Sequence, residues 1–266
     1  MNVTSPIIRG IYRISHGSYP KDKFSFATKK NCLRNFLKEF YNKSQSHISI
    51  FVDVCDTINQ SDTEKLISDI EDEIKKHQYY FAAGNTPNSQ IEVLSHVGGS
   101  SAQSFVNVLD QVMIRWNSPN YMNDIIYFVE DDYLHRPNAL KVLTEGIEIS
   151  DYVSLYDHRD KYIPAIMGGN KYIGKDGGET TKVFCTDTCH WKLTNSTTMT
   201  FATTMQTLAE DKPIFDSWTR NRTHPNDFSL FLELRECKRS LITPIPGYST
   251  HCEPQWASPL IDWSIV

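Results

Sequence analysis

The sequence predicts an α/β fold with a mainly parallel central sheet and helices on both of its faces. The first half of the chain alternates short β-branched runs with longer amphipathic segments, as expected for strands joined by helical crossovers. The run IIYFV at 125–129 is almost continuously apolar, which is typical of a strand buried on both faces. The chain has 266 residues, of which 39% are hydrophobic and 22% charged, enough for one large domain with a packed core.

The elements of the first half follow from periodicity. Leu66, Ile67, Ile70 and Ile74 recur at helical spacing, and the other predicted helices show the same pattern. Helices are expected at 26–41, 61–77, 100–116 and 138–149. Strands are expected at 7–14, 47–54, 79–83, 91–95 and 125–129.

The second half has a looser pattern. Five glycines between 168 and 178 predict a loop-rich excursion. A Pro-Asn pair at 225–226 is typical of a helix start. Strands are expected at 152–156 and 240–245, two β-like runs within 182–203, and helices at 204–215 and 225–235.

Composition restricts the environment and the partners. The chain carries 27 Lys and Arg against 32 Asp and Glu, a formal charge of −5, which argues against a nucleic-acid partner. No stretch reaches the roughly 18 apolar residues of a membrane span, and a cytoplasmic location is therefore expected. The six cysteines are expected as thiols, although the spacing of Cys185 and Cys189 leaves a disulfide or metal clip open.

The acidic triplet Glu130-Asp131-Asp132 directly follows the apolar run 125–129. Two like charges about 4 Å apart repel by roughly 4 kcal/mol at an effective dielectric of 20, so carboxylates at a buried strand end favour a bound cation. Hard oxygen ligands select Mg²⁺ or Mn²⁺. The alternative is that these acids are solvated and cap the following turn.

Other polar and small residues follow neighbouring predicted strands. Ser15, Asp53 and Asp56 come at or after strand ends, and the carboxyl ends of parallel strands meet at one edge, where ligands bind. Gly98-Gly99 precedes the helix at 100–116, and small residues at a helix start let a backbone approach an anion. Solvated strand ends and an ordinary helix start are the alternatives.

The segment IIYFVEDDYLHRPNALKVL at 125–143 resembles the metal-binding strand of GT-A (Rossmann-like) glycosyltransferases. Its Glu-Asp-Asp is most similar to that of Golgi N-acetylglucosaminyltransferases. The resemblance implies that Asp132 binds Mn²⁺ or Mg²⁺ and that Glu130 and Asp131 face the ribose of a nucleotide. It further implies a single GT-A domain over 1–266. Residues 1–150 would bind the nucleotide sugar, and 151–266 would supply the catalytic residues and a small acceptor-binding subregion.

The same resemblance suggests further site residues. In family 2 glycosyltransferases a Glu-Asp at a helix start is the catalytic base, and a His about 24 residues later ligates the metal. Asp227 and His251 have this spacing here, with Asn226 in place of the Glu. Asp216 is the rival base, because FDSW is locally similar to the Trp-Asp-Asp-Trp segment of the Golgi enzymes.

Donor and acceptor contacts are also implied. An acid after the second strand binds the base or ribose in GT-A enzymes, but DVCD at 53–56 leaves open whether Asp53 or Asp56 does so. Gly99 and Ser15 lie where the donor is expected. Trp191 and residues 195–200 are candidates for binding the acceptor sugar, by stacking and by hydrogen bonding.

These inferences combine into one function. A metal-dependent, inverting transfer is expected, from a nucleoside-diphosphate sugar, most simply a uridine-linked one, to a glycan hydroxyl. A nucleotidyltransferase is an alternative, although its usual Gly-rich loop with a basic residue is not evident at 15–23. A non-catalytic nucleotide-sugar-binding domain is the other alternative.

Overall fold

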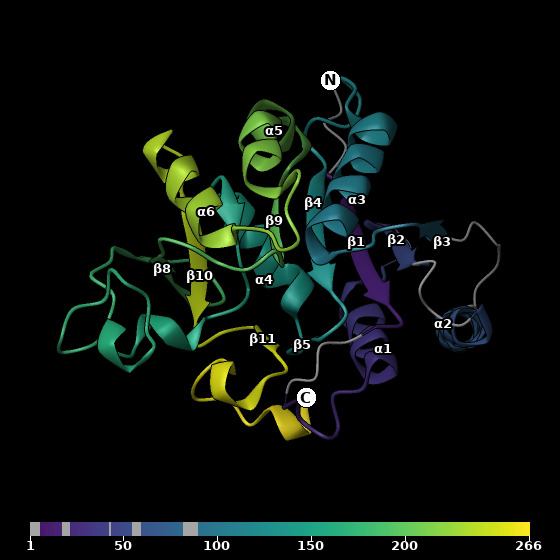
Figure 1. The fold of residues 1–266 in the computed structure, drawn as a ribbon, viewed down its shortest axis with the longest axis horizontal. Helices are drawn as coiled ribbons and strands as arrows, with labels where there is room; N and C mark the ends of the chain where they lie inside the picture. Colours follow the sequence, from purple (N-terminus) through teal and green to yellow (C-terminus); the bar gives the residue numbers. More distant parts are fainter. Residues whose placement is uncertain (1–5, 18–21, 43, 55–59, 82–89) are drawn as a thin grey trace.

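The computed structural model describes residues 6–17, 22–42, 44–54, 60–81 and 90–266. The chain forms an α/β fold around a nine-stranded sheet with the order β3-β2-β1-β4-β9-β6-β10-β8-β7, so the predicted fold class is confirmed (Figure 1). The strands of this sheet are β1 (Ile8–Ser15), β2 (Ser46–Asp53), β3 (Ile91–His96), β4 (Ile125–Glu130), β6 (Tyr152–Val153), β7 (Val183–Cys185), β8 (His190–Leu193), β9 (Phe201–Thr204) and β10 (Leu241–Ile245). The helices are α1 (Lys29–Phe40), α2 (Gln60–Phe81), α3 (Ser101–Trp116), α4 (Ala139–Ile147), α5 (Met205–Thr219) and α6 (Asp227–Glu236).

Strand direction brings the predicted site residues Ser15 and Asp53 to one edge of the sheet. Strands β3, β2, β1 and β4 are parallel, β6 and β10 are parallel to each other, and β8 and β9 run antiparallel to both of their neighbours. Ser15 at the end of β1 lies opposite Asp53, and Asp53 lies opposite His96. Polar residues at the ends of these strands therefore share the carboxyl edge of the sheet.

Both faces of the sheet are buried because successive side chains of β4 pack on opposite sides. Ile125, Tyr127 and Val129 contact the cluster that includes α1, α2 and α4. Ile126 and Phe128 contact the cluster that includes α3, α5 and α6. This double burial explains the continuous apolar run that predicted the strand.

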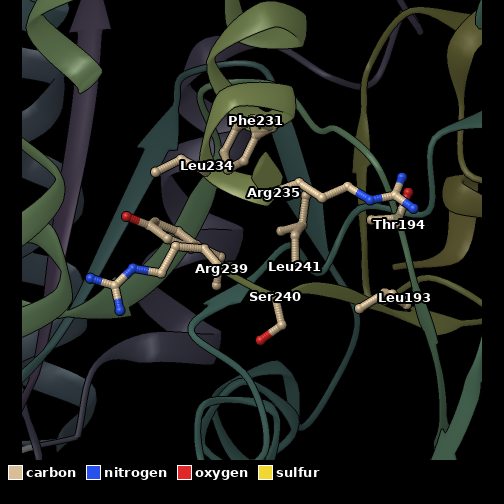
Figure 2. A pocket seen from close by; sticks show the side chains of 9 residues that line it. Leu193, Thr194, Phe231, Leu234, Arg235, Arg239, Ser240 and Leu241 are labelled. Atoms are coloured by element: carbon tan, nitrogen blue, oxygen red, sulfur yellow. The ribbon is translucent and has the colours of Figure 1, made fainter. Parts of the chain in front are cut away.

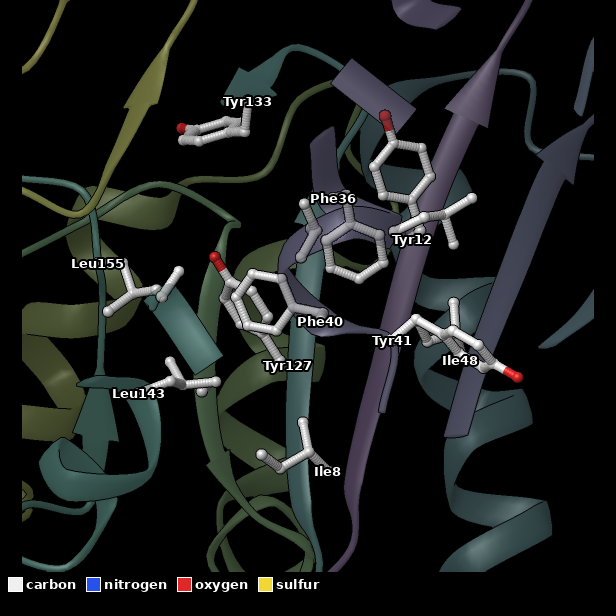
Figure 3. Close-up of a cluster of buried hydrophobic side chains, with 14 of the residues drawn as sticks. Ile8, Tyr12, Phe36, Phe40, Tyr41, Ile48, Tyr127, Tyr133, Leu143 and Leu155 are labelled. Carbon is white, nitrogen blue, oxygen red and sulfur yellow. The ribbon is translucent and has the colours of Figure 1, made fainter. Parts of the chain in front are cut away.

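The first of these clusters is rich in aromatic rings (Figure 3). Phe36 of α1 lies 5.0 Å from Tyr12 and 5.1 Å from Phe40, measured between ring centroids. Gly10 of β1 has no side chain because a Cβ there would lie 2.8 Å from Phe36 Cζ. The close approach of α1 to β1 fixes the start of that helix near the carboxyl edge.

Helix starts agree with their capping signals. Thr28 caps α1 by accepting from the Asn31 amide at 3.2 Å, and Ser100 caps α3 by accepting from the Gln103 amide at 3.1 Å. Asn226 caps α6, as the Pro-Asn pair predicted.

Several predicted elements differ in the structure. The strand expected at 79–83 is wrong for 79–81, which continue α2, because the first helix breaker after the amphipathic stretch is Gly84. Residues 82–83 lie outside the described part. The strand expected at 152–156 ends at Val153, and residues 182–203 contain three strands where two were expected.

Two short strands escaped prediction. β5 (Tyr133–His135) follows the acidic triplet directly, where a turn or a helix was expected, and β11 (Ser249–His251) pairs with it in an antiparallel two-stranded sheet. Strands of three residues are too short to show a period.

The structure also tests the predictions for Trp191 and for the pair Cys185 and Cys189. Trp191 is fully buried, so the prediction that it stacks on an acceptor sugar is wrong. Its indole packs against Gly146 of α4, where a Cβ would lie 2.7 Å from the ring. Cys185 and Cys189 are both free thiols. No helix in the described part of the chain is long and apolar enough to cross a membrane.

Phe36→Ala is expected to lower the free energy of unfolding by about 3–5 kcal/mol, because it leaves a cavity among three aromatic rings. Ile114→Ala is the matched control, since Ile114 is 76% exposed and its truncation is expected to change stability by less than about 0.5 kcal/mol. Urea denaturation of both variants measures the difference, and equal losses would contradict the described core.

Candidate functional site

The acidic triplet ends β4 at the carboxyl edge of the sheet, and each of its carboxylates has its own cationic partner. The cations come from β1, from the segment after it and from the first residue of α1. The pairs are Arg13–Glu130 at 3.0 Å, Lys29–Asp131 at 2.8 Å and Lys23–Asp132 at 2.9 Å. The three carboxylates are therefore ion-paired, in contrast to the alternative interpretation of the sequence, in which they are solvated and cap a turn.

Arg13 is held beside Glu130 by strand register, because the two residues lie directly opposite each other on β1 and β4. Its guanidinium also lies over the ring of Phe105, 5.2 Å from the centroid. Burial raises the pKa of Glu130, Arg13 opposes that rise, and the charges of Asp132 and Asp227 add to it.

Lys29 ties the end of β1 to Asp131. Its ammonium also bonds the carbonyl oxygens of Ser15 and Gly17, and the Ser15 amide donates to Asp131 at 3.1 Å. Burial raises the pKa of Asp131, and Lys29 opposes that rise. Ser15 and Asp131 are therefore neighbours, as their strand-end positions predicted.

Asp132 binds two cationic groups through a single oxygen. Its Oδ2 lies 2.9 Å from Lys23 Nζ and 3.2 Å from His251 Nε2. Burial opposes ionisation, yet His251 and Lys23 together hold the pKa of Asp132 below its usual range. Burial likewise opposes protonation of His251, and the hydrogen bond to Asp132 raises its pKa.

The two-stranded sheet explains how His251 reaches Asp132. His251 of β11 lies opposite Tyr133 of β5, and the Cys252 amide donates to the Asp132 carbonyl at 2.9 Å. Backbone hydrogen bonds thus bring Asp132 and His251 together although they are far apart in sequence. Figure 1 shows β11 beside β5.

Asp132 and His251 fit part of a Mg²⁺ or Mn²⁺ site. Two ligands about 2.1 Å from one ion at a right angle lie roughly 3.0 Å apart, close to the 3.2 Å between these ligand atoms. No group of three or more His, Cys, Asp or Glu side chains in the described residues is arranged to hold a metal. A cation there would need its remaining ligands from phosphate and water, which suits Mg²⁺ and Mn²⁺.

Asp53 holds the Gly-rich turn next to this edge. Its Oδ1 accepts from the Gly98 amide at 2.8 Å, and a Cβ on Gly98 would lie 2.0 Å from its Oδ2. Gly99 is exposed and has a φ of 77°, which glycine adopts without strain. The structure joins Asp53 to this turn, and Asp56 lies outside the described residues.

Asp227 begins α6 and is partly buried. Burial raises the pKa of its carboxyl to about 6, and the charges of Lys161 and Asp160 also act on it. The segment before α6 contacts the start of α3, which follows the Gly-rich turn, since the Ala102 amide donates to the Thr223 carbonyl at 3.2 Å. Together with its effect on Glu130, these contacts place Asp227 on the site side of the molecule.

Asp216 has a different environment. Its carboxylate lies 2.7 Å from Lys212 on α5 and 2.8 Å from Arg220, the residue that follows α5. These two cations also pair with Asp110 of α3, so Asp216 belongs to an ion-pair network between helices. This location favours Asp227 over Asp216 as the base.

The basic residues of the site were missed in the sequence. Arg13 stands in a strand that is buried along most of its length, and a cationic residue in such a strand was a usable signal. Lys23 and Lys29 lie in a loop and at a helix start, where no period distinguishes them from solvated lysines. Lys161 is buried and bonds Asn195 and Ser196 at 2.8 and 2.7 Å, so part of the predicted acceptor segment is used internally.

A small cavity lies away from this edge, between α6 and the start of β10 (Figure 2). Its volume of about 20 Å³ suits a single water molecule. Arg239 at its rim is bound by Asp211 and Glu210. The cavity is therefore not a substrate site.

Comparisons with known proteins show distant similarity of structure alone. No protein-family model matches the chain, and no curated protein matches it. A 4-diphosphocytidyl-2C-methyl-D-erythritol synthase from Anaerococcus prevotii is 9% identical, with a TM-score of 0.48 over 90% of this chain and 87% of that chain. A second structure with that synthase name is 13% identical, with a TM-score of 0.43 over 89% and 88%.

The similar structures also include TarS of S. aureus. It is 12% identical, with a TM-score of 0.44 over 88% of this chain and 35% of that chain. This chain thus spans about a third of the TarS chain. Identities this low indicate nothing about activity, so any activity has to be argued from the side chains of this chain's own site.

Gly98→Ala is expected to cost about 1–3 kcal/mol of stability, because the new Cβ clashes with Asp53 and with Ser104 Cβ, 2.8 Å away. Asp53→Ala in the same chain is expected to recover part of that loss, a coupling that a double-mutant cycle measures. Gly17→Ala is the control, since a Cβ there meets nothing within 4 Å. Strict additivity of the two substitutions would rule out the contact.

Proposed function

We propose that this protein is a metal-dependent, inverting glycosyltransferase that uses a nucleoside-diphosphate sugar. One observation carries the proposal. Asp132, at the carboxyl end of a buried strand, shares one oxygen between His251 and Lys23, and Asp227 lies on the same side with a raised pKa. Sugar transfer requires a carboxylate that can bind a cation and a base for the acceptor hydroxyl, and both lie on this side of the molecule.

The donor is proposed to lie along the carboxyl edge from β2 to β4. Glu130 and Asp131 would accept hydrogen bonds from ribose hydroxyls, and Asp53 or Asp56 from the base or ribose. Ser15 and Gly99 would line the same path, where an exposed glycine lets the donor approach the backbone. A uridine diphosphate sugar is the proposed donor.

Asp132 and His251 would hold Mn²⁺ or Mg²⁺. Such an ion would neutralise the negative charge that develops on the leaving diphosphate. Lys23 adds a positive charge at the same place.

Asp227 is proposed as the base. Its carboxylate would take the proton of an acceptor hydroxyl while that oxygen bonds to the anomeric carbon from the face opposite the diphosphate. The bond from the anomeric carbon to the diphosphate breaks in the same step, and the nucleoside diphosphate leaves with the electron pair. A pKa of about 6 leaves the base ionised at neutral pH yet able to hold a proton.

Nucleotidyl transfer is the second candidate. The segment after the first strand lacks the Gly-rich loop typical of nucleotidyltransferases, but it supplies basic groups, because Lys23 and Lys29 both reach the acidic triplet. Two ammonium groups at this position would suit a triphosphate as well as a diphosphate.

The products distinguish the candidates. A panel of nucleotide sugars with Mn²⁺ is expected to show slow release of nucleoside diphosphate from one donor, and Asp132→Ala is expected to lose metal-dependent nucleotide binding. Pyrophosphate release from a nucleoside triphosphate and a sugar phosphate would favour nucleotidyl transfer. Nucleotide binding with no turnover of any donor would favour a non-catalytic domain.

Asp227→Asn is expected to lower kcat by about 10²–10⁴ and to leave donor binding intact, because a general base contributes a factor of that size. In the wild type, kcat is expected to rise as the pH passes upward through about 6, since only the ionised carboxylate accepts a proton. The variant is expected to lack this rise. Near-normal turnover in Asp227→Asn with a large loss in Asp216→Asn would move the role to Asp216.

A further inference from the structure

Lys23 occupies the position on Asp132 that a metal ion is proposed to take. Its Nζ lies 2.9 Å from Asp132 Oδ2, the same oxygen that lies 3.2 Å from His251 Nε2. The Lys23 side chain is 24% exposed and that of Asp132 18%, so the pair is partly screened from water. The protein therefore supplies its own cation at the carboxylate oxygen that an external ion is proposed to bind.

The backbone near Lys23 is fixed to Cys252, the residue that follows the strand carrying His251. The Phe24 amide donates to the Cys252 carbonyl at 3.0 Å, and the Cys252 amide donates to the Asp132 carbonyl at 2.9 Å. These bonds keep the Lys23 backbone beside the site whatever its side chain contacts. A lysine side chain spans roughly 6 Å and has four rotatable bonds, so the ammonium can move while its backbone stays.

Lys29 provides a contrast within the same cluster. Its ammonium bonds Asp131 and the carbonyl oxygens of Ser15 and Gly17, so it is held by several acceptors. Among the described residues, the hydrogen bond and ion pair of the Lys23 ammonium are both made with Asp132. Of the two lysines, Lys23 is the one that a competing cation would displace.

A divalent ion and an ammonium repel each other when they share one carboxylate oxygen. The displaced ammonium stays within reach of the ion, where the proposed diphosphate places its negative oxygens. The ion pair of Lys23 with the nucleotide's diphosphate thereby compensates for the ion pair with Asp132 that Lys23 loses.

We propose that Lys23 is a diphosphate-binding residue that competes with the metal for Asp132 when no nucleotide is bound. This inference rests on the proposed function for its metal and its ligand. It has a consequence for binding: Lys23 weakens binding of the metal alone and strengthens binding of the metal with the nucleotide, so that the two ligands bind cooperatively.

Lys23→Met in the full chain tests this with Mn²⁺ and uridine diphosphate as probes. Electron paramagnetic resonance of Mn²⁺ alone is expected to show about tenfold tighter binding to the variant than to the wild type. Calorimetry of uridine diphosphate with Mn²⁺ is expected to show weaker nucleotide binding, and the factor by which each ligand improves binding of the other is expected to fall about tenfold or more.

Lys30→Met is the matched control, because it also replaces a lysine by methionine. The Lys30 ammonium pairs with Asp69 at 2.9 Å, away from the triplet. Its metal and nucleotide affinities are expected to equal those of the wild type. Lys23→Gln is a second variant that keeps a polar side chain, and thermal unfolding of all three checks that each is folded.

Several results would overturn the inference. Unchanged or weaker Mn²⁺ binding in folded Lys23→Met or Lys23→Gln would show that the ammonium does not compete. Nucleotide binding that is insensitive to chelation of metal in the wild type but lost in both variants would show that Lys23 replaces the metal.

If the cooperativity behaves as expected but no donor is turned over, the proposed transfer fails and the role of Lys23 stands.

Discussion

Three carboxylates crowded at the end of one buried strand are the constraint on which the rest of the site depends. Burial and mutual repulsion disfavour their ionised forms, so the fold has to bring a cation to each. Strand register supplies Arg13, the start of α1 supplies Lys29, and the segment between them supplies Lys23. The packing of α1 against β1 is thus an electrostatic requirement as well as a hydrophobic one.

The sequence predicted the half of the site that lies on regular elements. Strand–helix alternation predicted the sheet, and the run before Glu130 predicted which strand carries the acids. The countercharges were not predictable in the same way. Lys23 and Lys29 are ordinary lysines in composition and spacing, and their proximity to the triplet arises from the tertiary course of the chain after β1.

The second half of the chain was harder to predict because packing and pairing there override local pattern. Trp191 was predicted to stack on a sugar, yet it is buried in the main hydrophobic cluster, where its ring packs against Gly146 of a helix far away in sequence. The short strands β5 and β11 contain too few residues for a period, and their pairing is a long-range event. The proximity of Asp132 and His251 depends on that pairing.

The register of the β5–β11 sheet determines which side chain lies beside Asp132, and a register changes only by whole residues. Neighbouring strand residues point to opposite faces, so a slip of one residue in this pairing would present Thr250 or Cys252 to Asp132 in place of the imidazole. A residue gained or lost in the connection from β10 to β11 would therefore shift this register. Variants of this sequence should therefore keep the length of the short stretch 246–248 constant.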